Sequence, residues 1–278
     1  MKKVTWYDRI TPLPQHPARG TLAAKNYIES YSRVNFFFDW LSHMADSIDG
    51  VAEILDKAVL IGEDDEAKRL RIEEEAKLRL KMTDIFRSNE QMLLEIILGR
   101  HVDNYLNYFA ELLTNVFVAR PETLRSSEKI DMEDVLRHSS MEEFVRFAAE
   151  RKVEQLAYLA YSDLLDYFRK RFRIILARSG DVSIIVEAIE IRNISTHNRC
   201  IINARYCRRT GTDESQIGKM KVLRQETIQT IAKALFRSVC LADTASLRAL
   251  KLGSVPLSFK YQAKRRQNPA KTQSNVGK

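Results

Sequence analysis

An arginine, an asparagine and a histidine stand close together in the second half of the chain, at Arg192, Asn193 and His197. A guanidinium group binds phosphate oxygens through paired N–H donors, and an imidazole transfers protons near neutral pH. A carboxamide beside them can orient either group through hydrogen bonds. These residue types predict chemistry on a phosphodiester, and RNA is the expected substrate.

Helical spacing makes one copy of this motif incomplete. At about 100° per residue, Asn193 and His197 share a helix face, whereas Arg192 lies about 140° from His197. A two-fold dimer would bring two such patches together. We expect His197 to remove the proton from a ribose 2′-OH, which attacks the adjacent phosphorus while Arg192 holds the phosphate. The products would be a 2′,3′-cyclic phosphate and a 5′-hydroxyl, and the reaction would need no metal.

The same residues also fit purely structural roles. A helical histidine is commonly satisfied inside a bundle, and the alternative for Arg192 is a simple ion pair with Glu187 or Glu190. Four further arginines give a weaker prediction of contacts with RNA phosphates: Arg199, Arg205, Arg208 and Arg209. Their alternative is an exposed helix end, where the helix dipole favours cations. Four tyrosines fit core packing better than stacking on bases: Tyr105, Tyr108, Tyr158 and Tyr161.

Composition narrows the class of protein. The 278 residues include 45 Lys and Arg against 37 Asp and Glu, and the net charge of +8 is concentrated beside and after the motif, which suits a polyanionic partner. Three cysteines predict no disulfide framework, and their spacing from His197 matches no familiar zinc pattern, so we expect no cofactor. No apolar run approaches the roughly 20 residues that span a bilayer, and the N-terminus lacks the apolar core of a secretory signal. A cytoplasmic protein without a membrane partner is expected.

The elements that position the motif are predicted to be helices. Apolar periodicity and few glycines predict an all-α bundle, with helices over residues 22–60, 66–98, 101–119, 182–206 and 219–251. Ser139 and Ser140 are predicted to cap another helix that runs to about residue 177, and the acids before residue 66 to cap the second helix. The first helix carries a long apolar stripe: Val34, Phe37, Phe38, Leu41, Met44, Ile48, Val51 and Leu55. Gly99 is expected to interrupt the chain between helices, and Pro256 to end its ordered part.

The motif and its surroundings resemble the HEPN superfamily, whose helical bundles often carry Arg-Asn-x-x-x-His. The resemblance rests on Arg192, Asn193 and His197 within residues 187–199, and on the preceding segment at 154–176. It covers about residues 90 to 245. We therefore divide the chain into an extended segment at 1–20, an N-terminal helical extension at 21–89, a HEPN-like domain at 90–255 and a disordered basic tail at 256–278.

The resemblance implies a function as well as a fold. Many active members are metal-independent endoribonucleases of toxin–antitoxin, abortive-infection and other defence systems, and they usually act as dimers that bring two motifs together. It implies a homodimeric ribonuclease of toxin or antiphage type, held in check by an antitoxin or another regulatory partner. The family also includes members that lost activity. The alternative is a non-catalytic helical module that dimerises and binds nucleotide, RNA or a protein.

Overall fold

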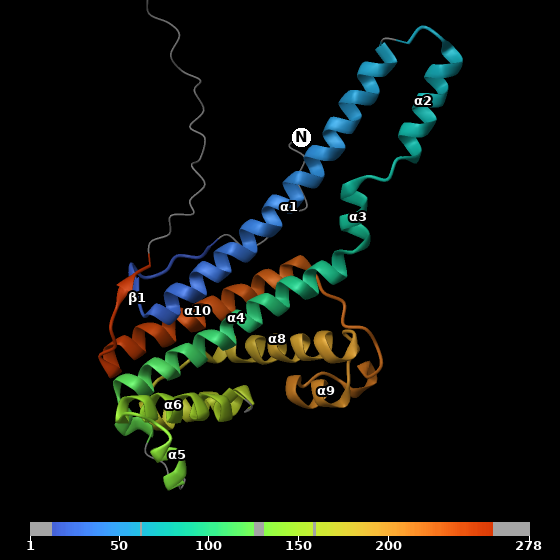
Figure 1. Ribbon diagram of the computed structural model, residues 1–278. Coiled ribbons are helices and arrows are strands. Elements are labelled where there is room, and N and C mark those ends of the chain that lie inside the picture. Colours follow the sequence, from blue (N-terminus) through green and yellow to red (C-terminus); the bar gives the residue numbers. More distant parts are fainter. Residues whose placement is uncertain (1–12, 62, 125–130, 158–159, 258–278) are drawn as a thin grey trace, which may run out of the picture.

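The computed structural model describes residues 13–61, 63–124, 131–157 and 160–257, and within them the chain is an all-α bundle, as predicted (Figure 1). The α-helices are α1 Leu22–Ile61, α2 Glu66–Leu78, α3 Met82–Ser88, α4 Glu90–Ala119, α5 Met132–Leu136, α6 Met141–Ala157, α7 Tyr161–Phe172, α8 Ser179–Asn198, α9 Ala204–Thr210 and α10 Gln225–Leu250. Short 3-10 turns are η1 Pro121–Leu124 and η2 Glu214–Gln216. Two short strands, β1 Arg19–Gly20 and β2 Val255–Pro256, pair antiparallel.

Helix α4 forms the centre of the bundle and contacts α1, α6, α8 and α10 (Figure 1). It is apolar on most of its circumference, so it buries side chains against all four neighbours. Tyr105, Tyr108 and Tyr161 are buried in this core, which confirms core packing for three of the four tyrosines; Tyr158 lies outside the described residues. The expected break at Gly99 is wrong, because α4 continues through it. A single helical glycine costs only about 1 kcal/mol, which burial on either side offsets.

The predicted helix over residues 66–98 is wrong in its middle, where the chain is extended at Arg79 and Lys81. Asp49 of α1 explains the break. Its carboxylate accepts the backbone N–H groups of Met82 (2.8 Å) and Thr83 (2.9 Å), and so caps α3 from another helix. The charged segment therefore folds back beside α1 as α2 and α3, and not as one straight helix with α4.

Local capping signals were sound predictors of where helices begin. Asp65 accepts the Ala67 N–H at the start of α2 (2.9 Å), and Ser140 accepts the Glu143 N–H at the start of α6 (3.2 Å). The ends were harder to predict. The helix expected to run to residue 177 is interrupted after α6, and α7 ends where Arg173 adopts a left-handed conformation (φ 60°). The last predicted helix, over 219–251, begins only at residue 225.

The two ends of the described chain meet on α10. Thr21 donates its backbone N–H (3.0 Å) and its hydroxyl to the buried carboxylate of Asp243. A Cβ at Gly20 would lie 2.8 Å from Leu257 and 2.9 Å from Asp243, so only glycine fits this approach without a shift. Pro256 pairs with β1, and the described chain ends at Leu257, one residue beyond the expected end; residues 258–278 of the expected tail lie outside the described residues.

Helix α1 belongs to the bundle at its first half and leaves it at its second (Figure 1). Tyr27, Ile28, Tyr31 and Phe38 are buried in the core, whereas most large apolar side chains further along α1 are exposed. We call residues 37–61 of α1 together with α2 and α3 the arm. The division of the chain into domains at residue 90 stays a prediction.

Candidate functional site

Helix α8 places the motif at the edge of the bundle, at the very end of the helix. It packs on α4 and α10 through a buried stripe made of Ile185, Ala188, Ile191 and Ile194. The prediction that this helix continues to residue 206 is wrong. Arg199 (φ 50°) and Cys200 (φ 60°) are left-handed, and the Cys200 N–H closes the last turn on the Ile194 carbonyl (2.9 Å). His197 therefore lies in the terminal turn of α8, and not in mid-helix.

Tertiary hydrogen bonds hold this helix end in place. The Lys221 N–H donates to the Cys200 carbonyl (2.8 Å), and the Ile202 N–H donates to the Lys219 carbonyl (2.9 Å). The side chain of Gln91 on α4 donates to the Lys221 carbonyl (3.1 Å). A left-handed residue other than glycine costs about 1–2 kcal/mol. These long-range bonds offset that cost, which is why no glycine marks the helix end in the sequence.

Arg192 is anchored by an acid that sequence reasoning missed. Its Nε and Nη2 both lie 2.9 Å from one carboxylate oxygen of Asp103 on α4, and its Nη1 donates to the side-chain oxygen of Asn193 (3.4 Å). The expected pairing with Glu187 or Glu190 is wrong, because those acids bind other cations. Nε and Nη1 each donate a hydrogen bond and Nη2 is in ion-pair contact with Asp103, which leaves at least one further N–H donor on each of Nη1 and Nη2. Such a pair of donors fits two oxygens of a phosphate.

His197 has no structural partner among the residues that the structure describes. Its side chain is exposed, and it forms no hydrogen bond or ion pair with the described part of the chain. Ser195, two residues before it, donates its hydroxyl to Glu95 of α4 (2.7 Å) and so fixes the same helical turn from its inner side. The alternative of a histidine satisfied inside the bundle is therefore wrong for His197. Its backbone is held firmly while its imidazole faces solvent.

The four arginines after the motif divide into two pairs. Arg205 (3.7 Å) and Arg209 (2.7 Å) both contact Glu190, whose side chain is only 4% exposed. They neutralise a buried acid, a role that their positions in sequence did not indicate. Arg199 and Arg208 are exposed and form no ion pair with the residues that the structure describes. Only this second pair has its charge fully available to an anion.

A cavity of about 350 Å³ opens beside Arg192 and Asn193. Its apolar wall comes from α4, α6 and α7, and includes Leu106, Phe109, Leu113, Leu156, Tyr161 and Leu164. Its polar rim consists of Asn107, Arg192, Asn193, Arg205 and Arg209. The acids that hold these arginines, Asp103 and Glu190, do not line it. Its volume is in the range of small-molecule pockets, but His197 is not part of its lining.

The three arginines of the rim outnumber the two acids that bind them. The lining therefore presents cations and amides above an apolar wall, and suits a ligand with a flat apolar body and an anionic group. Sequence reasoning missed this cavity because its walls come from helices far apart along the chain.

The described cysteines and acids do not favour thiol or metal chemistry at this site. Burial, together with the neighbouring Glu95 carboxylate, raises the pKa of the Cys200 thiol to about 12. Burial likewise raises the pKa of Cys240 to about 11. Both thiols are therefore protonated at neutral pH and are poor nucleophiles. Within the described residues, no group of three or more His, Cys, Asp or Glu side chains is arranged to hold a metal ion.

Comparison of the chain with protein-family models, with curated proteins and with solved structures found no match. The resemblance to the HEPN superfamily therefore stays a prediction that rests on Arg192, Asn193 and His197. None of the helices in the described ranges combines the length and the apolar character that crossing a membrane requires.

Proposed function

We propose that this protein is a metal-independent endoribonuclease that acts as a homodimer. The observation that carries the proposal is an exposed histidine without a partner among the described residues, His197, which lies five positions beyond an arginine that Asp103 holds in a fixed orientation. A firmly held backbone with a free imidazole suits proton transfer, and a fixed guanidinium with two spare donors suits phosphate binding.

The proposed reaction follows from these groups. The Nη1 and Nη2 donors of Arg192 bind the scissile phosphate and offset the charge that develops on its oxygens. His197 accepts the proton of the 2′-OH as that oxygen attacks phosphorus, and the bond to the 5′-oxygen breaks. His197 of a second copy, or water, protonates the leaving 5′-oxygen. Asn193 keeps the guanidinium in place through its side-chain oxygen.

The cavity would hold the base of a nucleotide next to the cleaved bond. Its wall offers an apolar surface with two aromatic rings, Phe109 and Tyr161, and its rim offers the amides of Asn107 and Asn193 for base edges. In this proposal the cavity binds and orients, and the exposed end of α8 supplies the proton transfer. A two-fold contact at that end would complete the site with a second imidazole. An active ribonuclease of this kind needs restraint, which fits a toxin or antiphage-defence effector with an antitoxin.

Cleavage of RNA in the presence of EDTA tests the proposal. Wild-type protein should yield 2′,3′-cyclic phosphate ends, and a 2′-deoxy substitution at the cleaved position should stop the reaction. His197→Ala should lower the rate by about 10²–10⁴-fold, as expected for loss of a general acid–base group. His43→Ala, which removes an exposed histidine of the arm, is the matched control and should cleave normally. Equal cleavage by His197→Ala and wild type, or loss of cleavage in EDTA, would refute the proposal.

A non-catalytic nucleotide-binding or RNA-binding module is the second candidate. Two observations favour it: Asp103 neutralises Arg192, and His197 lies outside the lining of the cavity. Under this alternative the protein would bind a nucleotide with the same affinity in wild type and His197→Ala, without turnover. Arg192→Ala would weaken that binding.

A further inference from the structure

The exposed end of α8, Arg192 and the cavity follow one another in that order where α8 packs on α4. Near the end of α8, Ser195 donates its hydroxyl to Glu95 (2.7 Å). Further from that end, the guanidinium of Arg192 lies 2.9 Å from Asp103. The part of α4 that lines the cavity, at residues 106–113, begins about one turn beyond Asp103. The guanidinium of Arg192 therefore lies between the exposed end of α8 and the apolar wall.

Distances along α8 agree with this order. At about 1.5 Å per residue, His197 lies about 7.5 Å beyond Arg192 along the helix axis. Ile189, which lines the cavity, lies about 4.5 Å before Arg192 along the same axis. A phosphate held by Arg192 thus has the proton-transfer group on one side and the cavity on the other.

We propose that the cavity holds the base of the nucleotide on the 3′ side of the cleaved bond. This inference rests on the proposed function, in which His197 removes the proton from the attacking 2′-OH. The attacking and leaving oxygens lie roughly in line, on opposite sides of the phosphorus. As the bond from the 2′-oxygen to phosphorus forms on the side of His197, the bond to the 5′-oxygen breaks on the side of the cavity. The leaving oxygen, which takes up a proton from water or from a second copy, belongs to the 3′ nucleotide.

The aromatic wall of the cavity is held in place by contacts within the core. Phe109 lies edge-on to Tyr105 and Phe168, with ring centroids 5.0 Å and 5.7 Å apart. The hydroxyl of Tyr161 shares a hydrogen bond with that of Tyr105 (2.6 Å). Because these rings are fixed before a ligand enters, a base that packs against them loses little free energy to reordering of the protein.

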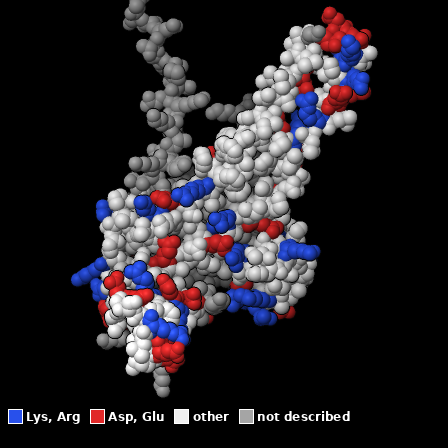
Figure 2. Space-filling model, viewed as in Figure 1, with Lys and Arg blue, Asp and Glu red and all other residues white. Residues whose placement is uncertain are grey.

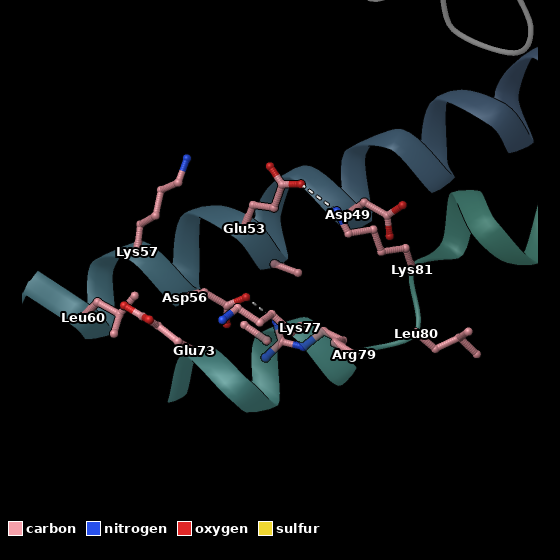
Figure 3. Close-up of a pocket in the computed structure, with 12 residues that line it drawn as sticks. Asp49, Glu53, Asp56, Lys57, Leu60, Glu73, Lys77, Arg79, Leu80 and Lys81 are labelled. Carbon is pink, nitrogen blue, oxygen red and sulfur yellow. Dashed lines mark hydrogen bonds and ion pairs between the residues drawn. The ribbon is translucent and has the colours of Figure 1, made fainter. Parts of the chain in front are cut away.

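A larger groove between α1 and α2, the arm groove, offers no comparable site. It has a volume of about 510 Å³, and four acids and four cations line it (Figure 3). They include two ion pairs, Glu53 with Lys81 (3.2 Å) and Asp56 with Arg79 (2.9 Å), and none of the described residues that line the groove is aromatic. Figure 2 shows the contrast in charge: basic side chains gather over α9, which contributes to the rim of the cavity, whereas acidic and basic side chains are mixed at the far end of the arm.

Strands with a single cleavable bond test which nucleotide the cavity holds. One ribonucleotide is placed among 2′-O-methyl nucleotides, so that only its 2′-OH can react. An abasic unit then replaces either the base of this ribonucleotide or the base of its 3′ neighbour, and kcat/KM is measured with wild-type protein. Loss of the 3′ base should lower kcat/KM about 5- to 150-fold, the effect of one missing base–aromatic contact. Loss of the base on the 5′ side should leave kcat/KM nearly unchanged.

Substitutions that fill the cavity test the location. Ala110→Phe places a ring in the cavity, and should lower kcat/KM on the intact strand to about the value for the strand without the 3′ base. Asn107→Trp repeats the test at the exposed rim, where a larger side chain disturbs no core packing. Ala52→Phe is the matched control, because Ala52 lines the arm groove, and it should cleave like wild type. Circular dichroism checks that each variant keeps its helical content.

The outcomes separate this inference from the proposed function. A stronger dependence on the base on the 5′ side would place the attacking nucleotide in the cavity, and would overturn the inference while cleavage by His197 stands. Undiminished use of the 3′ base by folded Ala110→Phe and Asn107→Trp would overturn it in the same way. Wild-type protein that cleaves neither these strands nor unmodified RNA would refute the proposed function and the inference together.

Discussion

The buried histidine of α4 allows a quantitative prediction about stability. His101 is 1% exposed, and neither ring nitrogen has a hydrogen-bond partner among the described residues. Its ring lies 4.8 Å from the ring of Tyr31. Burial lowers the pKa of His101 from 6.5 to about 4, because the charged imidazolium would lose its hydration without gaining a partner. The folded protein therefore holds this side chain neutral at pH 7.

The pH dependence follows from linkage. The unfolded chain takes up a proton near pH 6.5, whereas the folded chain resists it until the pH is about 4. The contribution of His101 is thus fully present above pH 6.5 and is lost as the pH falls from 6.5 to about 4. The difference of about 2.5 between the two pKa values lowers the free energy of unfolding by about 3 kcal/mol below this window. Near pH 4.5 the free energy of unfolding is lowered by about 2–3 kcal/mol.

His101→Phe isolates this contribution because it keeps a flat ring and removes the titrating group. Urea unfolding of wild type and variant at about pH 7 and pH 4.5 gives the free energies of unfolding. At the lower pH the free energy of unfolding of the variant should exceed that of wild type by about 2–3 kcal/mol more than it does at neutral pH. His43→Ala, which alters an exposed histidine, should show no such gain. If the free energies of unfolding of His101→Phe and wild type fall by the same amount between neutral and acidic pH, the reasoning is refuted.

Three further substitutions test individual contacts. Asp103→Asn should free Arg192 from its fixed orientation and lower the rate of RNA cleavage about 10-fold. The melting temperature should change little, because both side chains are partly solvated. An unchanged rate of cleavage would contradict the anchoring role of Asp103. Glu190→Gln should lower the free energy of unfolding by about 1–3 kcal/mol in urea, because a buried acid bound by two arginines loses its charge. Gly20→Ala should cost about 1–3 kcal/mol in the same assay through its clash with Leu257.

Local signals in the sequence were enough to predict the all-α fold and several helix starts. Asp65 and Ser140 cap helices through bonds to residues two or three positions away, so a short window contains both partners. The break before α3 had no such signal. Its cap comes from Asp49, more than thirty positions earlier, and only the folded arrangement of α1 and α3 brings the two together.

The sequence suggests residues for a candidate site but does not indicate what holds them in place. Arg192 and His197 were recognisable by type and spacing, whereas the Asp103 anchor is 89 positions from Arg192. The spacing of apolar residues likewise predicted the apolar stripe of α1. It did not predict that the second half of this stripe is exposed, because spacing shows only that a helix face is apolar and not which element packs on it. The end of α8 was missed for the same reason, since bonds from residues 219–221 stabilise left-handed residues that a local reading would not place there.

The pairing of arginines with acids also predicts how RNA binding should respond to salt. Affinity for single strands falls with a slope of about −0.7 per phosphate contact in a plot of log K against log salt. If all five arginines at 192, 199, 205, 208 and 209 contacted phosphates, the slope would be about −3.5. Glu190 holds Arg205 and Arg209, whereas Arg192 keeps spare N–H donors for a phosphate beside its contact with Asp103, so we expect a slope of about −2 from Arg192, Arg199 and Arg208.

Fluorescence anisotropy with His197→Ala, which prevents cleavage, measures this slope. Arg199→Ala should make it shallower by about 0.7, and Arg205→Ala should leave it unchanged. A slope near −3.5, or equal effects of the two substitutions, would show that Glu190 releases its arginines when RNA binds. The acid would then act as a competitor for the bound phosphate, and not as a fixed structural partner.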